Sequence, residues 1–213
     1  MRYVDMQTWP RRGHFELFNA FDFPHFNLCA DIDITPIHKA LPRARFSFTV
    51  VIVYALAKAA NAITEFRYRI RNGQVVEHDM VHPSPTILRG DDLFSFCTIP
   101  FNDDFKTFAA EAEAAIAHIK ERPTLDDQPG QDELIYMTSI PWVSFTSFIH
   151  PIHMIPVDSI PRIAWGKFFP KGDRTNMPLS VQVHHALADG IHVGRYFNLV
   201  QEYLDEPDRF FDV

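Results

Sequence analysis

Two adjacent histidines, followed closely by an aspartate and a glycine, are the residues whose types and spacing best suit catalysis. They lie in the segment PLSVQVHHALADGIHVGRYF, where the doublet is His184-His185 and the following pair is Asp189-Gly190. A histidine released at the end of a strand beside a glycine turn can project into a cleft. Histidine is the usual general base for a hydroxyl because its ordinary pKa lies near neutral pH. The segment therefore indicates proton abstraction from an alcohol.

The alternative is that His185 is a core residue whose ring is satisfied by the backbone. For an arbitrary histidine that interpretation is the more common one. The doublet, with aspartate and glycine following at the fourth and fifth positions, favours a functional role.

The elements around this segment must position it. Leu179, Val181 and Val183 alternate with other residues, as in a strand that ends at the doublet. Thr8 is expected to cap the first helix, and Asn72-Gly73 predicts a hairpin turn. We predict helices at about residues 10–20, 47–63, 103–120 and 191–204, and strands near 26–34, 66–71, 74–77, 86–88, 93–99, 133–138, 162–169 and 179–184.

Strands and helices are mixed without a regular βαβ rhythm, which predicts an α+β fold with a large mixed sheet. The acids of residues 103–120 are expected in the first turn of that helix. Residues 121–132 are expected to form a surface loop, because they are rich in Pro, Asp and Gly.

Composition indicates one globular domain over residues 1–213. The chain is 46% hydrophobic and 22% charged, and its net charge of −7 argues against a nucleic-acid partner. The longest apolar stretch, residues 46–60, is too short to span a bilayer. No hydrophobic signal core begins the chain, so we expect a cytoplasmic protein without a membrane partner. Cys29 and Cys97 are expected to be free thiols.

Several blocks together resemble the chloramphenicol acetyltransferase family. HHALADG is similar to the HHxxxDG signature of CoA-dependent acyltransferases, which several superfamilies share. The blocks WPRRGHFELF, EFRYRIRNGQ, SIPWVSFTSF and WGKFFPKGD follow in family order and at family-like spacing. The resemblance covers residues 3 to 204. It implies a two-layer sandwich of a large mixed sheet with helices, a homotrimer, and active sites at subunit interfaces.

The resemblance also implies four catalytic residues. In the family the second histidine, here His185, deprotonates the acceptor hydroxyl, while His184 has a supporting role. The signature aspartate, here Asp189, pairs with an arginine two residues after a tryptophan, which is Arg11. The oxyanion donor falls on Thr138. Its neighbour Ser139 is less suitable, because a strand would point it to the opposite face.

The resemblance places the acceptor in a largely aromatic pocket. The family positions fall on Phe18, Phe26, Phe94, Phe148, His150, Ile152, Arg162 and Ala164. Three of these depart from the family, since His150 and Arg162 replace aliphatic residues and Ala164 replaces a threonine. A buried arginine is costly without a partner, so either the local fold differs or the acceptor is more polar than chloramphenicol, and an anionic acceptor is one form of this alternative.

The implied co-substrate is acetyl-CoA, with Lys167 and Arg45 as candidate phosphate contacts and Trp142 and Phe168 as walls for the pantetheine arm. His150 and His153 have no acidic or cysteine partner at a suitable spacing, so we expect no metal site. The function implied is O-acetylation of chloramphenicol or a related small-molecule alcohol. The alternatives are an acetyltransferase for a more polar hydroxylated metabolite, or a non-catalytic paralogue that only binds an acceptor.

Overall fold

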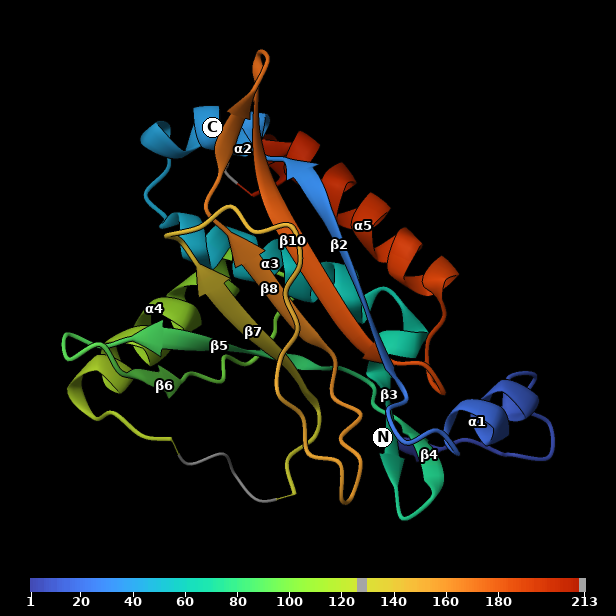
Figure 1. The fold of residues 1–213 in the computed structure, drawn as a ribbon. Coiled ribbons are helices and arrows are strands. Elements are labelled where there is room, and N and C mark those ends of the chain that lie inside the picture. Colours follow the sequence, from blue (N-terminus) through green and yellow to red (C-terminus); the bar gives the residue numbers. More distant parts are fainter. Residues whose placement is uncertain (126–129, 211–213) are drawn as a thin grey trace.

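The computed structural model describes residues 1–125 and 130–210, and a large twisted sheet runs through it (Figure 1). Seven strands form this sheet in the order β2-β10-β8-β7-β5-β6, with β9 paired to β10. Their bounds are β2 His25–Asp33, β5 His82–Leu88, β6 Phe94–Phe96, β7 Leu134–Ile140, β8 Arg162–Gly166, β9 Phe169–Lys171 and β10 Arg174–His184. The neighbours β5, β7 and β8 are parallel, and the other pairs are antiparallel. The predicted mixed sheet is therefore confirmed.

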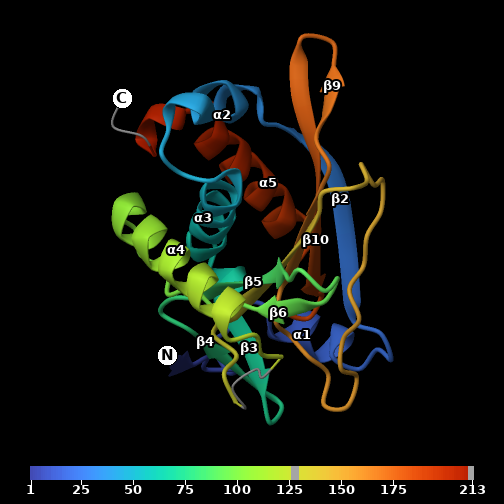
Figure 2. The ribbon, with the colours of Figure 1, turned by 90° about the vertical axis from the view of Figure 1, so that its left-hand side faces the viewer.

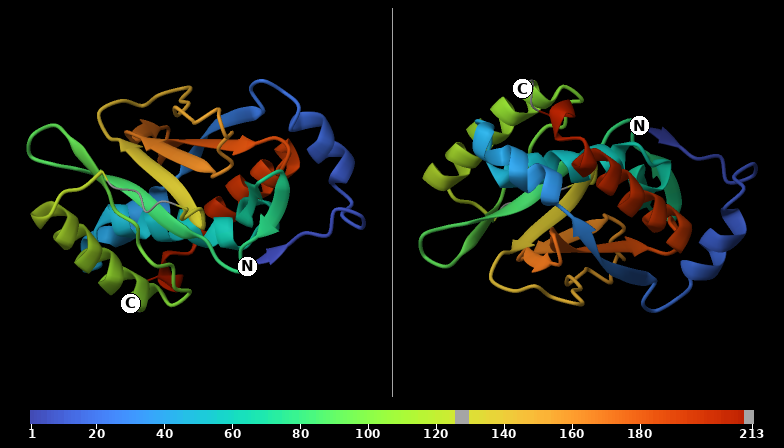
Figure 3. Two further views of the ribbon diagram at one scale, coloured as in Figure 1. Left: turned by 90° about the horizontal axis from the view of Figure 1, so that it is seen from below. Right: turned by 90° about the horizontal axis from the view of Figure 1, so that it is seen from above.

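Helices cover one face of the sheet, which gives the predicted two layers (Figure 2). This layer contains α2 Thr35–Ala40, α3 Phe48–Asn61, α4 Phe105–Glu121 and α5 Gly190–Asp205. The short helix α1 Arg12–Phe18 lies instead at the edge of the molecule, beside the start of α5 (Figure 3). A second sheet, in the order β1-β4-β3, joins β1 Arg2–Tyr3, β4 Gln74–Glu77 and β3 Tyr68–Arg71. Within the described residues, no helix combines the length and apolar composition that crossing a membrane requires.

The helix α3 is the centre of the hydrophobic core. Every residue from Val50 to Ala57 is buried, as expected of a helix that is apolar on all sides. Ser47 caps it, because its Oγ accepts a hydrogen bond from the backbone N–H of Val50 at 3.3 Å. The predicted helix over residues 47–63 is confirmed with slightly shorter ends.

Other sequence signals have the expected local effect. Asn72 and Gly73 have φ angles of 50° and 74°, as a tight hairpin between β3 and β4 requires. The predicted helix over 103–120 is present as α4. Its first turn holds no acid, however, because Asp104 is the N-cap and accepts a hydrogen bond from the Thr107 N–H at 2.8 Å. Residues 126–129 of the predicted surface loop lie outside the described residues.

Several predicted boundaries are wrong for identifiable reasons. Thr8 does not cap the first helix, since its hydroxyl bonds to Asp5 and α1 begins only at Arg12. Residues 64–67 form a 3₁₀ turn, so β3 is shorter than the predicted strand at 66–71. The predicted strand at 162–169 is divided into β8 and β9, and the predicted strand at 179–184 is the last part of the longer β10.

The strand β5 begins earlier than predicted because prolines conceal its first half. Pro83 and Pro85 cannot donate backbone hydrogen bonds, and proline is depleted in strands. Their carbonyl oxygens nevertheless accept hydrogen bonds from Ile99 and Cys97, at 2.9 and 3.0 Å. At these two prolines the strand is thus paired through its acceptors alone.

A long connection, residues 141–161, crosses the face of the sheet opposite the helices (Figure 1). It is bonded to β10, since the Ser180 hydroxyl donates to the Phe148 carbonyl and the His150 N–H donates to the Gln182 side chain. At Gly166 it approaches the sheet so closely that an added Cβ would stand 2.8 Å from the Val143 carbonyl oxygen. Only glycine fits there without a shift of backbone.

The buried Arg69 joins the small sheet to the start of β7. Its side chain is fully buried, and it donates to four backbone carbonyl oxygens, those of Phe66, Tyr68, Asp132 and Leu134. Burial lowers the pKa of this guanidinium to about 10, so it remains charged at neutral pH. A single cation thus donates to four backbone acceptors that come from two separate parts of the chain.

Replacing Arg69 by methionine should destabilise the protein strongly. Because the four carbonyl oxygens lose their donor, we expect a loss of about 3 kcal/mol in the free energy of unfolding, which corresponds to roughly 6–12 °C in melting temperature. Thermal unfolding followed by circular dichroism measures this. The matched control is Arg12→Met, which removes only an exposed pair with Glu16 and should change little. Equal melting temperatures for the two variants would contradict the assignment.

Candidate active site

His185 stands at the end of β10, immediately before α5. Its backbone N–H donates to the Pro24 carbonyl at 2.7 Å, which fixes the chain at this point. The imidazole stacks on Phe18 with ring centroids 3.7 Å apart, and the Phe26 ring flanks it at 4.7 Å. The side chain is 32% exposed. Two predicted acceptor-pocket residues therefore hold the ring in place without covering it.

An ion pair braces the loop that carries this histidine. Asp189 and Arg11 form a bidentate pair, in which Nη2 lies 2.7 Å from Oδ1 and Nη1 contacts Oδ2. Arg11 also donates to the carbonyl oxygens of His185 and Ala186, at 2.7 and 3.1 Å. The hydrogen bond from Arg11 lowers the pKa of the Asp189 carboxyl. The pair that the family resemblance implied is present. Arg11 binds the Asp189 carboxylate and also two backbone carbonyl oxygens of the same loop.

Asp189 also faces the histidine ring itself. The Nδ1 atom of His185 lies 3.2 Å from Asp189 Oδ1, although the two groups are not aligned as a hydrogen bond. At the same residue the Asp189 N–H donates to His192 Nδ1 at 2.9 Å, which closes the first turn of α5. Because Nδ1 of His185 is shielded from solvent beside a carboxylate, Nε2 is the nitrogen left for a substrate proton.

His184 has a different environment from its neighbour. Its side chain is buried, and its Nδ1 accepts a hydrogen bond from the Ala186 N–H at 3.2 Å. Burial, assisted by nearby His25, lowers the pKa of His184 to about 3. A ring that stays neutral and bonds to its own loop supports the turn and is not placed to take up a proton.

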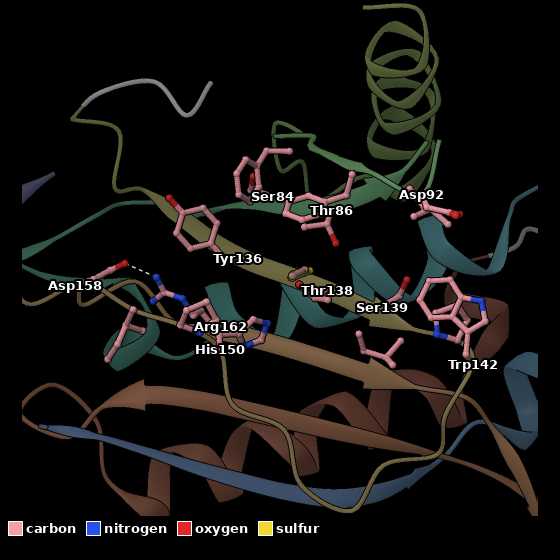
Figure 4. A pocket seen from close by; sticks show the side chains of 18 of the residues that line it. Ser84, Thr86, Asp92, Tyr136, Thr138, Ser139, Trp142, His150, Asp158 and Arg162 are labelled. Carbon is pink, nitrogen blue, oxygen red and sulfur yellow. Dashed lines mark hydrogen bonds and ion pairs between the residues drawn. The ribbon is translucent and has the colours of Figure 1, made fainter. Parts of the chain in front are cut away.

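A cavity of about 860 Å³ lies over β7, bounded by β5, β6 and the crossing connection (Figure 4). Thr138 and Ser139 both line it. The assignment of Thr138 over Ser139 as oxyanion donor stays a prediction, because Met137 lines the cavity as well although its side chain is buried in the core. Four predicted acceptor or cofactor residues also line the cavity: Phe94, His150, Ile152 and Trp142.

Arg162 also lines the cavity, with a partner that the sequence did not reveal. Asp158 forms an ion pair with its guanidinium, and both side chains are largely buried. Tyr136 adds a ring 5.2 Å from the guanidinium carbon. The only signal in the sequence for Asp158 was its place four residues before an arginine expected to be buried.

His185 does not line this cavity. Ala164 pairs with Thr138 on one side and with Ser180 on the other, so these three residues mark one level across the sheet. His184 is four residues beyond Ser180, about 13 Å further along β10 at the usual strand rise. Thr138 and His185 of the same chain are therefore too far apart to contact one reacting group.

The remaining predicted site residues are dispersed. Phe148 packs edge-to-face with the His150 ring, with centroids 4.7 Å apart, and does not line the cavity. Ala164 is fully buried in β8. Phe168 packs against His38 and Phe48, beyond the cavity. Lys167 and Arg45 are exposed.

A second cluster of titratable groups lies at the opposite end of β7. Donor atoms of His78, Asp132 and Glu133 lie within 4.8 Å of one another. Burial would raise the pKa of Asp132, but hydrogen bonds from Arg71 and His78 lower it overall. Because a guanidinium already occupies the carboxylate, this cluster is explained as an ion-pair network.

Known proteins resemble the chain over most of its length. A family model described as chloramphenicol acetyltransferase matches residues 1–201. A chloramphenicol acetyltransferase of Klebsiella sp is 34% identical over 206 residues, which cover 95% of this chain and 93% of the relative. Chloramphenicol acetyltransferase 3 of Escherichia coli is 33% identical over 200 residues, which cover 93% and 94% of the two chains.

Solved structures resemble the fold as well. One chloramphenicol acetyltransferase structure has a TM-score of 0.85 and 27% identity, with coverage of 95% of this chain and 99% of that one. A probable dihydrolipoamide acetyltransferase from Listeria monocytogenes has a TM-score of 0.68 over 97% and 95% of the two chains. At 13% identity, that second likeness concerns the fold alone.

Replacing Asp189 by asparagine should destabilise the loop in a pH-dependent way. At pH 7 the loss of a charge-assisted bidentate contact should cost about 1.5–3 kcal/mol of unfolding free energy. The native pKa of Asp189 lies below its ordinary value of about 3.9. The stability that ionised Asp189 contributes is therefore complete above that value, declines as pH falls below it, and disappears as pH passes the native pKa. Urea titrations between pH 7 and pH 3 should therefore show the variant approaching the wild type on acidification.

The matched control for this prediction is Asp31→Asn, which removes a partly exposed pair with Lys171. It should cost less than about 1 kcal/mol at pH 7. A difference between Asp189→Asn and wild type that stays constant from pH 7 to pH 3 would show that the carboxylate charge is not what Arg11 holds.

Proposed function

The chain belongs to the chloramphenicol acetyltransferase family, and on that premise we propose that it transfers acetyl from acetyl-CoA to a hydroxyl of chloramphenicol or a related acceptor, with His185 as general base. The observation that carries the proposal is the exposed imidazole of His185, stacked on Phe18 and held beside the Asp189–Arg11 pair. Such a ring is oriented but still accessible, which a general base requires.

The proposed reaction takes one proton from the acceptor and returns it to the thiol. Nε2 of His185 accepts the hydroxyl proton while the hydroxyl oxygen attacks the thioester carbonyl carbon. The carbonyl oxygen becomes an oxyanion, which the Thr138 hydroxyl stabilises by a hydrogen bond. When the carbon–sulfur bond breaks, the imidazolium returns its proton to the departing thiolate of CoA. The Asp189 carboxylate lies 3.2 Å from Nδ1 of that ring.

The co-substrate would reach the thioester position from the Trp142 end of the cavity. Trp142 is 63% exposed and lines the cavity, so its ring can cover an apolar arm. Lys167 and Arg45, both exposed, supply positive charge for CoA phosphates, and Phe168 adds apolar surface beside Lys167. A protein that uses acetyl-CoA and has two free cysteines fits the cytoplasm.

The separation of His185 from Thr138 supports a homotrimer with active sites between subunits. Neither half is complete on one chain, since the base lies outside the cavity that holds the hydroxyl and the acceptor walls. Large apolar side chains are exposed near both halves, which is typical of surfaces that associate. They are Phe21 and Phe23 after α1, and Ile149 and Ile155 on the crossing connection. We propose that His185 of one subunit faces the cavity of the next.

Replacing His185 by alanine should lower kcat by about 10²–10⁴, because the hydroxyl loses its base. A thiol-release assay with acetyl-CoA and chloramphenicol measures the rate, and unchanged far-ultraviolet circular dichroism shows that the variant is folded. His14→Ala, which removes an exposed histidine of α1, is the control and should retain activity. Full turnover by His185→Ala would rule out this base, and an inactive wild type would favour the non-catalytic binding alternative.

Mixing two inactive variants tests the proposed arrangement of subunits. His185→Ala and Thr138→Val should each be slow alone. When the two are denatured together and refolded, some interfaces combine an intact His185 from one subunit with an intact Thr138 from the other, so activity should return. The control is mixing without denaturation, which should restore nothing. Failure to regain activity in properly assembled mixed oligomers would place both residues of one site on a single chain.

A further inference from the structure

One end of the cavity is polar, although most of its wall is apolar. Figure 4 shows Tyr136, His150, Asp158 and Arg162 together at this end, and Trp142 at the other. Thr138 lies between the two ends on β7. The polar end is thus part of the acceptor cavity but separate from the oxyanion position.

The charge of Arg162 is already balanced at this end. One guanidinium nitrogen contacts Asp158 Oδ2, and another donates to the Ile160 carbonyl at 3.0 Å. The second carboxylate oxygen of Asp158 accepts from the Ile160 N–H at 2.7 Å. With Arg162 and Asp158 engaged by each other, the end presents no net charge. A free carboxylate on an acceptor would meet Asp158 as well as Arg162.

His150 differs from these residues because its ring has no polar partner. Both ring nitrogens are shielded from solvent and lack a hydrogen-bond partner among the described residues. The backbone N–H of His150 donates to the Gln182 side chain, and its ring packs edge-to-face with Phe148. Burial, and then the charge of Arg162, lowers the pKa of His150 to about 4. At neutral pH the ring therefore offers one donor and one acceptor.

A ligand can engage this ring at little cost. The χ2 torsion of histidine is broad, so a rotation can turn a ring nitrogen into the cavity, and no existing hydrogen bond is lost. Unpaired buried polar groups are unfavourable, which means that a ligand supplying a partner removes a penalty already present in the free protein.

The register of the sheet sets the distance between this ring and the reacting group. Arg162 pairs with Tyr136 and Ala164 pairs with Thr138. Two residues of strand separate these levels, or about 7 Å. An acceptor that reacts near Thr138 therefore places its far end at the level of Arg162.

We propose that His150 is a specificity-determining residue that hydrogen-bonds a neutral polar group on the acceptor, about 7 Å from the hydroxyl that is acetylated. The preferred acceptor is an alcohol with an amide-like far end, and neither an apolar nor an anionic one. The inference rests on the proposed function, because that function places the reacting hydroxyl near Thr138. It replaces the anionic acceptor considered from the sequence with a neutral one.

Three acceptors of nearly equal size test the proposal: 2-phenylethanols that carry a carboxamide, an isopropyl group or a carboxylate at the para position. For the wild type, kcat/KM for the carboxamide should exceed the other two by about tenfold, the effect of one hydrogen bond. His150→Leu should abolish the preference for carboxamide over isopropyl, and His150→Gln should restore part of it. Ile152→Val, another cavity residue, should change all three alike.

A second variant tests the balanced charge. Asp158→Asn leaves Arg162 without its counter-charge, so the carboxylate acceptor should improve several-fold relative to the carboxamide. An unchanged ranking in His150→Leu, or a carboxylate preferred by the wild type, would overturn the proposal.

Binding without acetyl-CoA separates this proposal from the proposed function. Quenching of Trp142 fluorescence, with Trp142→Phe as the blank, reports acceptor binding in the cavity. If the three acceptors bind in the predicted order but none is acetylated, the role of His150 in acceptor binding is supported and the proposed function fails. If they are acetylated at equal rates and bind equally, the proposed function is supported and the role of His150 in specificity is refuted.

Discussion

The contact between Arg11 and Asp189 is the interaction on which the site depends. It joins a short N-terminal helix outside the main layers to the turn between the longest strand and the last helix. Because the same guanidinium also binds the carbonyl oxygens of His185 and Ala186, it fixes backbone and side chain together. The α1 helix can then bring Phe18 against the imidazole. Phe15 of α1 is also buried against Tyr68 and Leu187, so the ion pair and apolar packing together fix the stacking partner of the ring.

Strand geometry imposes the second constraint. The rise of β10 carries His185 away from the level of Thr138, and no rotamer of either side chain can span that distance. The chain therefore presents a base at one place and an acceptor cavity at another. An arrangement of this kind makes sense when a neighbouring subunit supplies the missing half, which is why we propose that catalysis and assembly depend on each other.

Much of the fold could be predicted because local signals agreed with their surroundings. The Ala-rich helix capped by Ser47, the Asn72-Gly73 turn and the strand leading to the histidine doublet are all present. The family resemblance, which the sequence matches confirm, located Arg11 opposite Asp189. Some failures were local, such as Thr8 bonding to Asp5 and not capping α1, and the others arose where a long-range contact decided the outcome. Partners distant in sequence determine how β5 pairs despite its prolines, and Asp158 and Ser139 became part of the cavity only through packing.

The close approach at Gly166 has an evolutionary consequence for the connection that crosses the sheet. The backbone of that connection is held by its contact with the glycine, by a hydrogen bond from the Ser180 hydroxyl, and by one that the His150 N–H donates to Gln182. Around Phe148 and His150 its path is thus set by groups on the sheet, and the side chains there are left to vary. Elsewhere the connection is held by its own side chains, those of Ser144, Asp158 and Ser159. Residues such as His150 and Ile152 can be exchanged in successive generations without remodelling the scaffold. A lineage that keeps this framework can change its acceptor through single substitutions, and the protein can remain folded after each one.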